Sequence, residues 1–442
     1  MLRSKVYSMA PRCSFARAMA TVAQISPFSF HVGQTNGIKI ASRDDGRPTA
    51  ALSVVVRAGS RYQPIPGLAH ILERFAFKST SERTALRITR ESELLGGKLS
   101  SSVTRDSIIL TAEFLREDLP YYVQLLGDTL TKTKLERHIF TEDVIPQLAL
   151  QYSSLSTLDI TSDALHNVAF RRGLGNTLYS NPQYPVLLQD VKAFANKSYI
   201  SGNLSIVATG ADSTELKDLV QQHFAKIPSG SPAQISGTTY YGGDVRINGP
   251  SKESLVILAF PGASSPLAGS PELGILANLL GGKSSIKWSA GNTLLSQLAG
   301  KLGNEVSAFA QHITHTDAGL LTVTLAGPSS TITKLAKAVV QTVHLISKGE
   351  GIREVDVKRA IAQTKFQFTN AFDERTSAVE KIGQSLIGES TSVKTQEVVA
   401  ELDKVTFAQV KSAATNLLKN KASLVALGDT YLLPYADELS PK

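Results

Sequence analysis

Sulfur is nearly absent from this sequence. Its 442 residues include one cysteine and three methionines, and all of them lie within the first 19 residues. Because no residue beyond Cys13 carries a thiol, the body of the chain can form no disulfide, no thiolate metal site and no cysteine nucleophile. An iron–sulfur cluster held by cysteine thiolates is excluded for the same reason.

Long hydrophobic runs are also missing. The longest weakly charged stretches, such as Leu255–Pro271, contain Pro, Gly and Ser and stay below the roughly 18 apolar residues that a membrane-spanning helix needs. We therefore expect any membrane association to run through other proteins. With 42% hydrophobic and 19% charged residues, the composition indicates a soluble chain with a sizeable core, and the length predicts two or three domains.

Acidic side chains are missing from the N-terminal segment 1–24, which is rich in Arg, Ser and Ala and has no continuous apolar run. This composition is typical of a mitochondrial transit peptide, with a disordered basic tail as the alternative. Its removal would lower the net charge of the chain from +8 to +4, because the segment holds four basic residues and no acid. The remaining Lys and Arg are scattered, so we expect no nucleic-acid partner.

The order of expected elements occurs twice along the chain. Each half begins with an apolar strand, continues with a helix, a hairpin and further helices, and ends with a strand before a glycine. The two final strands resemble each other, NLSIVATGAD at 203–212 and ASLVALGDT at 422–430. The sequence therefore predicts an α+β fold with two homologous halves, 25–227 and 246–442, joined by a linker at 228–245 that is rich in Pro, Gly and Ser.

The clearest motif lies on the first expected helix, at His70-Ile-Leu-Glu73-Arg74. An H-x-x-E-H helix places two histidines one turn apart, where both bind zinc, and the glutamate acts as general base on the metal-bound water. Here Arg74 replaces the second histidine, and a guanidinium has no lone pair to offer a cation. One histidine does not hold zinc, because such sites need at least three protein ligands.

The motif resembles that of a known family, the mitochondrial processing peptidases and core proteins of peptidase family M16. The resemblance extends over GSRYQ at 59–63, GLAHILERFAFK at 67–78, the segment 96–120 and the duplicated halves. It implies two M16-type half-domains. Active members supply a third zinc ligand, a glutamate farther along the chain, where this sequence has Leu148, two residues after Pro146. The resemblance thus implies a vestigial motif (His70, Glu73, Arg74, Leu148) with no catalytic residue, no metal and no cofactor.

The segment 280–298 resembles the core proteins. It has only Gly281 and Gly282 at a place where the non-catalytic subunit of the processing peptidase has a longer glycine run. This implies a scaffold subunit of the dimeric ubiquinol–cytochrome c reductase (cytochrome bc1) complex, peripheral on the matrix side of the mitochondrial inner membrane. Its partners would be a homologous core protein 1 and the other subunits of that complex.

Two alternatives stay open. One is the non-catalytic α-type subunit of the processing peptidase, which binds basic presequences, although a net charge near +4 does not favour that task. The other is an active metallopeptidase with substituted ligands.

Two further histidines, His312 and His315, lie three residues apart in a strand-to-turn stretch without a nearby acidic pair. We interpret this pair as a surface feature.

Overall fold

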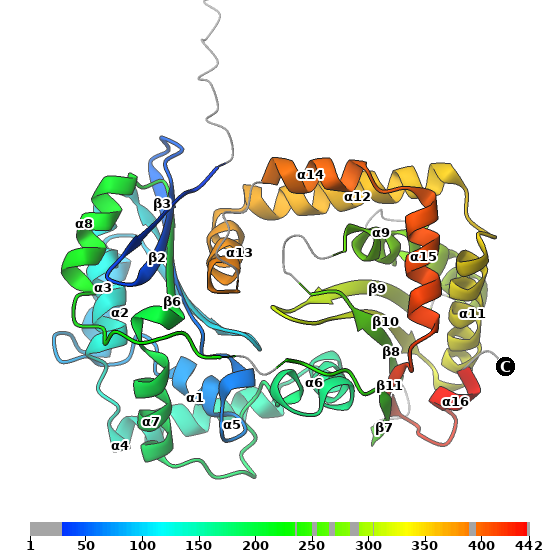
Figure 1. Cartoon of the computed structure of the whole chain (residues 1–442). Helices are drawn as coiled ribbons and strands as arrows, with labels where there is room; N and C mark the ends of the chain where they lie inside the picture. The colour runs from blue at the N-terminus through cyan, green and yellow to red at the C-terminus, as the bar shows by residue number, and fades with distance from the viewer. Residues whose placement is uncertain are drawn as a thin grey trace, which may run out of the picture.

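The computed structural model describes residues 29–234, 237–249, 254–264, 270–282, 291–303, 305–388 and 395–439, so the predicted transit peptide lies outside the described residues. Two mixed sheets, each flanked by helices, form the two halves of the molecule, and the predicted α+β fold is confirmed (Figure 1). The first sheet has the strand order β1-β2-β6-β3-β5-β4, and the second has the order β7-β11-β8-β10-β9. The strands are β1 His31–Thr35, β2 Ile38–Arg43, β3 Thr49–Val56, β4 Lys98–Val103, β5 Ile108–Leu115, β6 Leu204–Thr209, β7 Gly243–Asn248, β8 Ser254–Gly262, β9 Ser307–Thr314, β10 Gly319–Gly327 and β11 Ser423–Gly428.

The central strands are buried on both faces of their sheets. In β3, residues 50 to 56 are all buried, and its neighbours β5 and β6 both run antiparallel to it. Side chains alternate between faces along a strand. Leu52 and Val54 therefore enter the core beneath the helices of the first half, whereas Ala51 lies on the opposite face in a separate cluster.

The first sheet is covered on one face by α1, α2, α3 and α8, and the second by α9, α10, α11 and α15. The helices are α1 Leu68–Arg74, α2 Ala85–Leu94, α3 Leu119–Thr131, α4 Arg137–Ile139, α5 Ile145–Ser153, α6 Thr157–Phe170, α7 Leu188–Ser198, α8 Ser213–His223, α9 Pro271–Leu280, α10 Leu294–Leu302, α11 Ser329–Lys348, α12 Glu354–Asp373, α13 Arg375–Gly388, α14 Thr395–Asp403, α15 Phe407–Leu418 and α16 Ala436–Leu439.

Each half lends one helix to the opposite face of the other sheet. The C-terminal helix α13 packs on β3 and β6 of the first sheet, and the N-terminal helix α6 packs on β8 and β11 of the second (Figure 1). Val379 and Ile382 of α13 share a buried cluster with Val207 of β6. Neither sheet buries its second face without the other half, so the two halves form one packed structure.

The second sheet begins before the end of the predicted linker 228–245. Residues from Gly243 onward already belong to β7, which pairs in parallel with β11. The sequence of β7, GDVRIN, has only two hydrophobic residues. The strand lies at the edge of the sheet. The hydrophobic pattern that identifies a buried strand is therefore absent, and the pairing with β11 defines this strand.

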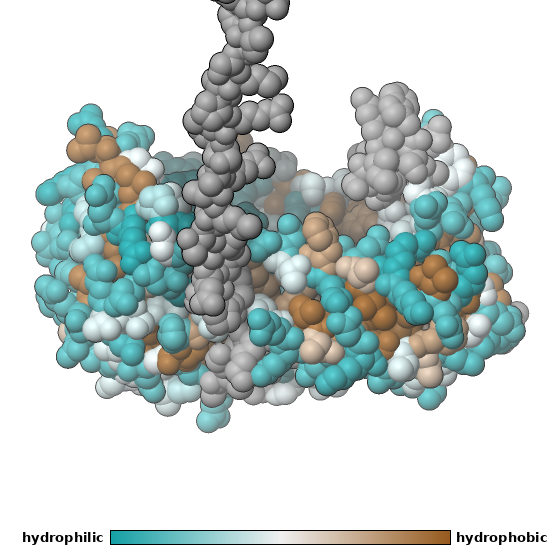
Figure 2. Space-filling model, turned by 90° about the horizontal axis from the view of Figure 1, so that it is seen from above, coloured by the Kyte–Doolittle hydropathy of each residue, from teal (hydrophilic) through white to brown (hydrophobic). Residues whose placement is uncertain are grey.

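Within the described ranges, no helix has the length and apolar character needed to cross a bilayer. Hydrophobic patches nevertheless interrupt the hydrophilic surface over the C-terminal half, on the right of Figure 2. Two large side chains of α12, Val355 and Phe366, are 69% and 68% exposed. Contiguous exposed hydrophobic patches mark surfaces that contact other proteins or ligands, whereas single exposed hydrophobic side chains are ordinary.

Candidate functional site

Helix α1 carries the peptidase-like motif and is held by the preceding GSRYQ segment. The buried side chain of Gln63 accepts a hydrogen bond from the N–H of Ala69 at 3.1 Å and donates one to the carbonyl of Thr177 at 2.8 Å. Gln63 thus satisfies a free donor in the first turn of α1. The helix ends at Arg74, and Phe77, three residues later, has a positive φ of 59°.

Both ring nitrogens of His70 are engaged by protein groups. The N–H of Ser180 donates to Nδ1 at 3.1 Å, and Nε2 lies 3.2 Å from Oε1 of Gln151. Because Nδ1 accepts, the proton of the neutral ring is on Nε2, which donates to Gln151. Burial, with a further contribution from Arg74, lowers the pKa of His70 to about 4. The imidazole is therefore neutral, and its one lone pair is already used.

Arg74 supplies a positive charge beside the buried carboxylate of Glu73. Its Nε lies 3.3 Å from Oε2 of Glu73, and its Nη2 donates to Oε1 of Gln151 at 2.7 Å. Burial raises the pKa of Glu73. Two groups act to lower this pKa: the hydroxyl of Ser101, which donates to Oε1, and the guanidinium of Arg74. The guanidinium thus provides the charge that a metal ion would otherwise supply next to this carboxylate.

The helix that faces α1 begins with an irregular turn. A π-helical segment, Phe140–Val144, leads directly into α5, and Pro146 lies in the first turn of α5. Proline has no N–H to donate back along the helix, so a locally widened turn accommodates it.

Leu148, which the resemblance places at the third ligand position, is 2% exposed and lies in the hydrophobic core. The side chain that reaches His70 is Gln151, one helical turn later, which the sequence analysis missed. The signal was present, because residues i and i+3 lie on one helix face. In the part of the chain that the structure describes, no three His, Cys, Asp or Glu side chains come close enough to hold a metal ion.

The interpretation of His312 and His315 as a surface pair is wrong. His315 is 8% exposed, and its Nε2 lies 3.1 Å from Nε2 of His166 on α6. His312 is partly buried, and burial lowers its pKa to about 4. His315 lies where the halves meet, and nothing in the sequence indicated that α6 would pack there.

The geometry of a peptidase motif without its metal ligands agrees with comparisons to known families. A family model described as insulinase (peptidase family M16) matches residues 39–182, and one described as the peptidase M16 inactive domain matches residues 186–364. The chain belongs to peptidase family M16, and the resemblance inferred from the sequence is confirmed.

Its relatives include the mitochondrial cytochrome b-c1 complex subunit 2 of several organisms. The protein from Neurospora crassa is 40% identical over 96% of this chain and 94% of its own length. The Schizosaccharomyces pombe protein is 40% identical over 93% of this chain and 95% of its own. The human protein is 28% identical, with 91% and 90% covered.

Proposed function

We propose that this chain is a non-catalytic subunit of the mitochondrial cytochrome b-c1 complex, where it acts as a scaffold for assembly and stability. The observation that carries the proposal is similarity along nearly the whole chain to relatives named as subunit 2 of that complex. The His70 site supports the non-catalytic role, because its imidazole and carboxylate are engaged by Ser180, Gln151, Arg74 and Ser101.

The finer parts of the proposal concern location and partners. The chain acts as a peripheral subunit on the matrix side of the inner membrane and pairs with a homologous core protein 1 inside a dimeric complex. Two sheets that share helices give a rigid body, and exposed apolar side chains such as Phe366 are available for contacts with neighbouring subunits. Permanent interfaces of this kind commonly bury more than about 2,000 Å² of apolar-rich surface.

Depletion of the chain in a respiring cell tests this function. We expect the cytochrome b-c1 complex to stop accumulating on native gels, while cleavage of imported presequences continues at its normal rate. Re-expression of the unmutated chain and of Glu73→Gln, which removes the only general base of the motif, should restore the complex equally. If depletion blocks presequence cleavage and the complex still assembles, the processing-peptidase alternative is right and the proposal is wrong.

A further inference from the structure

An apolar groove lies between α12 and α14 in the C-terminal half. Its volume is about 440 Å³, which is the size of a small ligand-binding site. The apolar part of its lining comes from Phe372 of α12 and from Val399 and Ala400 of α14. Of the nine residues of α14, only Thr395 and Leu402 are buried. The groove side of α14 is therefore incompletely covered by the described residues, which favours an apolar occupant.

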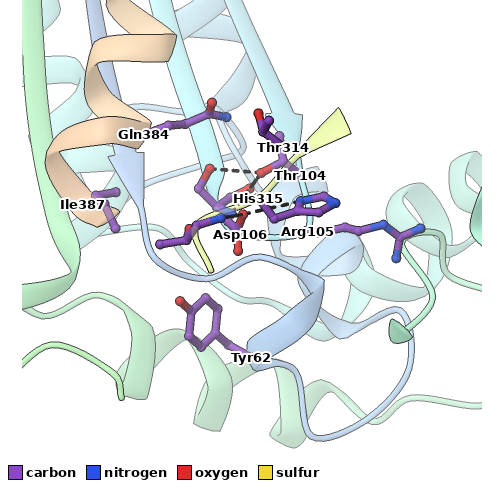
Figure 3. A pocket seen from close by; sticks show the side chains of 10 residues that line it. Tyr62, Thr104, Arg105, Asp106, Thr314, His315, Gln384 and Ile387 are labelled. Carbon is purple, nitrogen blue, oxygen red and sulfur yellow. Dashed lines mark hydrogen bonds and ion pairs between the residues drawn. The ribbon is translucent and has the colours of Figure 1, made fainter. Parts of the chain in front are cut away.

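The cavity at which the turns of the two sheets meet is smaller, about 180 Å³, and Figure 3 shows Asp106 and His315 side by side at its edge. Nδ1 of His315 lies 3.6 Å from Oδ2 of Asp106. Arg61 donates to Asp106 at 2.9 Å and to Asp317 of the other half at 2.7 Å. This cluster around His315 has its partners within the chain, whereas the groove between α12 and α14 leaves room for an occupant.

The charges around the groove do not require a basic occupant. Asp403 in its lining accepts from Lys365, whose Nζ lies 2.8 Å from both carboxylate oxygens. Asp373, also in the lining, interacts electrostatically with Arg43 of β2. Because each carboxylate already interacts with a cation of this chain, a neutral, apolar occupant fits the groove better than the basic segment 1–17 does.

The described chain begins next to this groove. Phe30, its second described residue, is 6% exposed and shares a buried cluster with Phe372, whose side chain also lines the groove. Figure 1 shows the blue N-terminal end of the described chain beside the adjoining ends of α12 and α14. Four extended residues span up to about 14 Å. The residues just before Ser29 are therefore tethered within reach of the groove.

The sequence of this tethered segment suits an apolar groove. Residues 18–30 carry no charged side chain, and residues 25–28 are Ile-Ser-Pro-Phe. Proline favours an extended chain with about three residues per turn, which would present Ile25 and Phe28 on one side. The other segment attached to the groove, residues 389–394 before α14, has the sequence ESTSVK and only one hydrophobic residue. It matches the apolar lining less well.

We propose that residues 25–28 bind in the groove between α12 and α14 as an N-terminal strap, with the side chains of Ile25 and Phe28 inserted between the two helices. The strap joins the start of the first sheet to α14 of the other half, and so adds to the contacts made by the cluster around His315. Because the segment is tethered, its effective concentration at the groove is in the millimolar range. The strap follows the predicted transit peptide 1–24 and therefore remains in the mature chain.

Engineered cysteine pairs test the strap, because the chain has no cysteine beyond Cys13. In a Cys13→Ser background, Ser26→Cys is combined either with Ala400→Cys, in the groove, or with Glu401→Cys. The second pair is the matched control, since Ala400 and Glu401 are exposed neighbours on α14 but Glu401 does not line the groove. The full chain is purified natively with whatever subunits accompany it and then oxidised, and mass spectrometry quantifies the disulfide-linked peptides.

We expect the disulfide between positions 26 and 400 to form at least about tenfold more than that between positions 26 and 401, because the tethered strap is held at the groove. Equal yields of the two disulfides, including the absence of both, would overturn the proposal. A disulfide from position 400 only to another subunit would also overturn it and would assign the groove to that subunit.

Hydrogen exchange provides a second test, without a new covalent bond. Phe28→Ser removes an apolar side chain from the strap, and Phe28→Leu keeps one there. We expect amide exchange in α14 to accelerate at least about tenfold in Phe28→Ser, as for loss of one buried apolar side chain, and to change little in Phe28→Leu. Exchange in α11, which packs on α10 and α15 instead, should stay the same in both variants.

Two results of this second test would contradict the strap. One is unchanged exchange of α14 in Phe28→Ser, and the other is equal acceleration in Phe28→Ser and Phe28→Leu. N-terminal sequencing of the same samples shows whether residues 25–28 are present. A mature chain that begins after residue 28 would lack the strap and would overturn the proposal as well.

Discussion

Substitution of Gly383 tests the exchange of helices between the halves. Gly383 lies in α13, and a Cβ at this position would lie 2.4 Å from Cγ2 of Val55 on β3. Alanine would favour the helix by about 1 kcal/mol, but the overlap must push α13 from the sheet, which costs about 1–3 kcal/mol. It would also strain the hydrogen bond from Ser205 to the Gly383 carbonyl, which is 2.8 Å long. We expect Gly383→Ala to lower the stability of the chain by up to about 2 kcal/mol.

A second helical glycine provides the control. Gly274 in α9 has its nearest neighbour 3.7 Å from the built Cβ, which is ordinary contact. Gly274→Ala should therefore raise stability by up to about 1 kcal/mol, because only the helix preference changes. The assay is the thermal shift of this chain in the purified assembly, followed by mass spectrometry of the soluble fraction.

The double variant Gly383→Ala/Val55→Ala isolates the contact. Val55→Ala alone removes buried methyl groups and should destabilise the chain, but in the Gly383→Ala background it also relieves the overlap. We expect a coupling of about 1–2 kcal/mol in the double-mutant cycle. Additive effects, or a Gly383→Ala variant as stable as Gly274→Ala, would refute the packing of α13 on β3.

Four further outcomes follow from the sequence and from the His70 site. The unmutated chain should contain no stoichiometric zinc by elemental analysis, whereas Arg74→His/Gln151→Glu, which returns two ligand types beside His70 Nε2, should bind it. Arg74→Met should destabilise the chain by about 1–2 kcal/mol, since the guanidinium is partly exposed, and Glu73→Gln in the same chain should recover most of that loss in urea unfolding. The lowered pKa of His70, about 4 against 6.5, means that the unfolded state binds the proton more tightly. The contribution of neutral His70 to the free energy of unfolding should therefore be fully present above pH 6.5 and be lost as the pH falls from 6.5 to 4. The free energy of unfolding of His70→Gln should fall less steeply over the same range. N-terminal sequencing of the mitochondrial protein should show a start after Arg17, and a mature chain beginning at residue 1 would refute the targeting prediction.

The sequence predicted the repeated order of elements because the central strands are apolar. The run Leu255–Phe260 of β8 is buried on both faces, and a continuous hydrophobic run of strand length indicates this directly. Helices α6 and α13 were missed because α6 is rich in Ser, Thr and Asp and α13 contains a glycine in its middle, residues that usually interrupt helices. In α13 that glycine is required by contact with Val55, which only the folded structure shows.

The candidate site was predictable only in part for a related reason. The residue types at 74 and 148 predict that metal ligands are lacking there, because neither arginine nor leucine offers a lone pair to zinc. The partners of His70 could not be predicted, since Gln151 and Ser180 meet it through the packing of α5 and of a distant loop. The cluster around His315 was likewise invisible, because its members come from both halves of the chain.

The surroundings of His70 and Glu73 explain physically how these two buried polar side chains are accommodated. A buried carboxylate is costly unless a positive charge and hydrogen bonds compensate it, and a buried imidazole must find partners for both nitrogens. Arg74 and Ser101 satisfy Glu73, while Ser180 and Gln151 satisfy His70. Replacement of any one of these groups leaves another unpaired, so hydrogen bonds and one ion pair hold this group of side chains together. The side chains at the positions of the peptidase motif therefore fix α1 against α5 and the Ser180 segment.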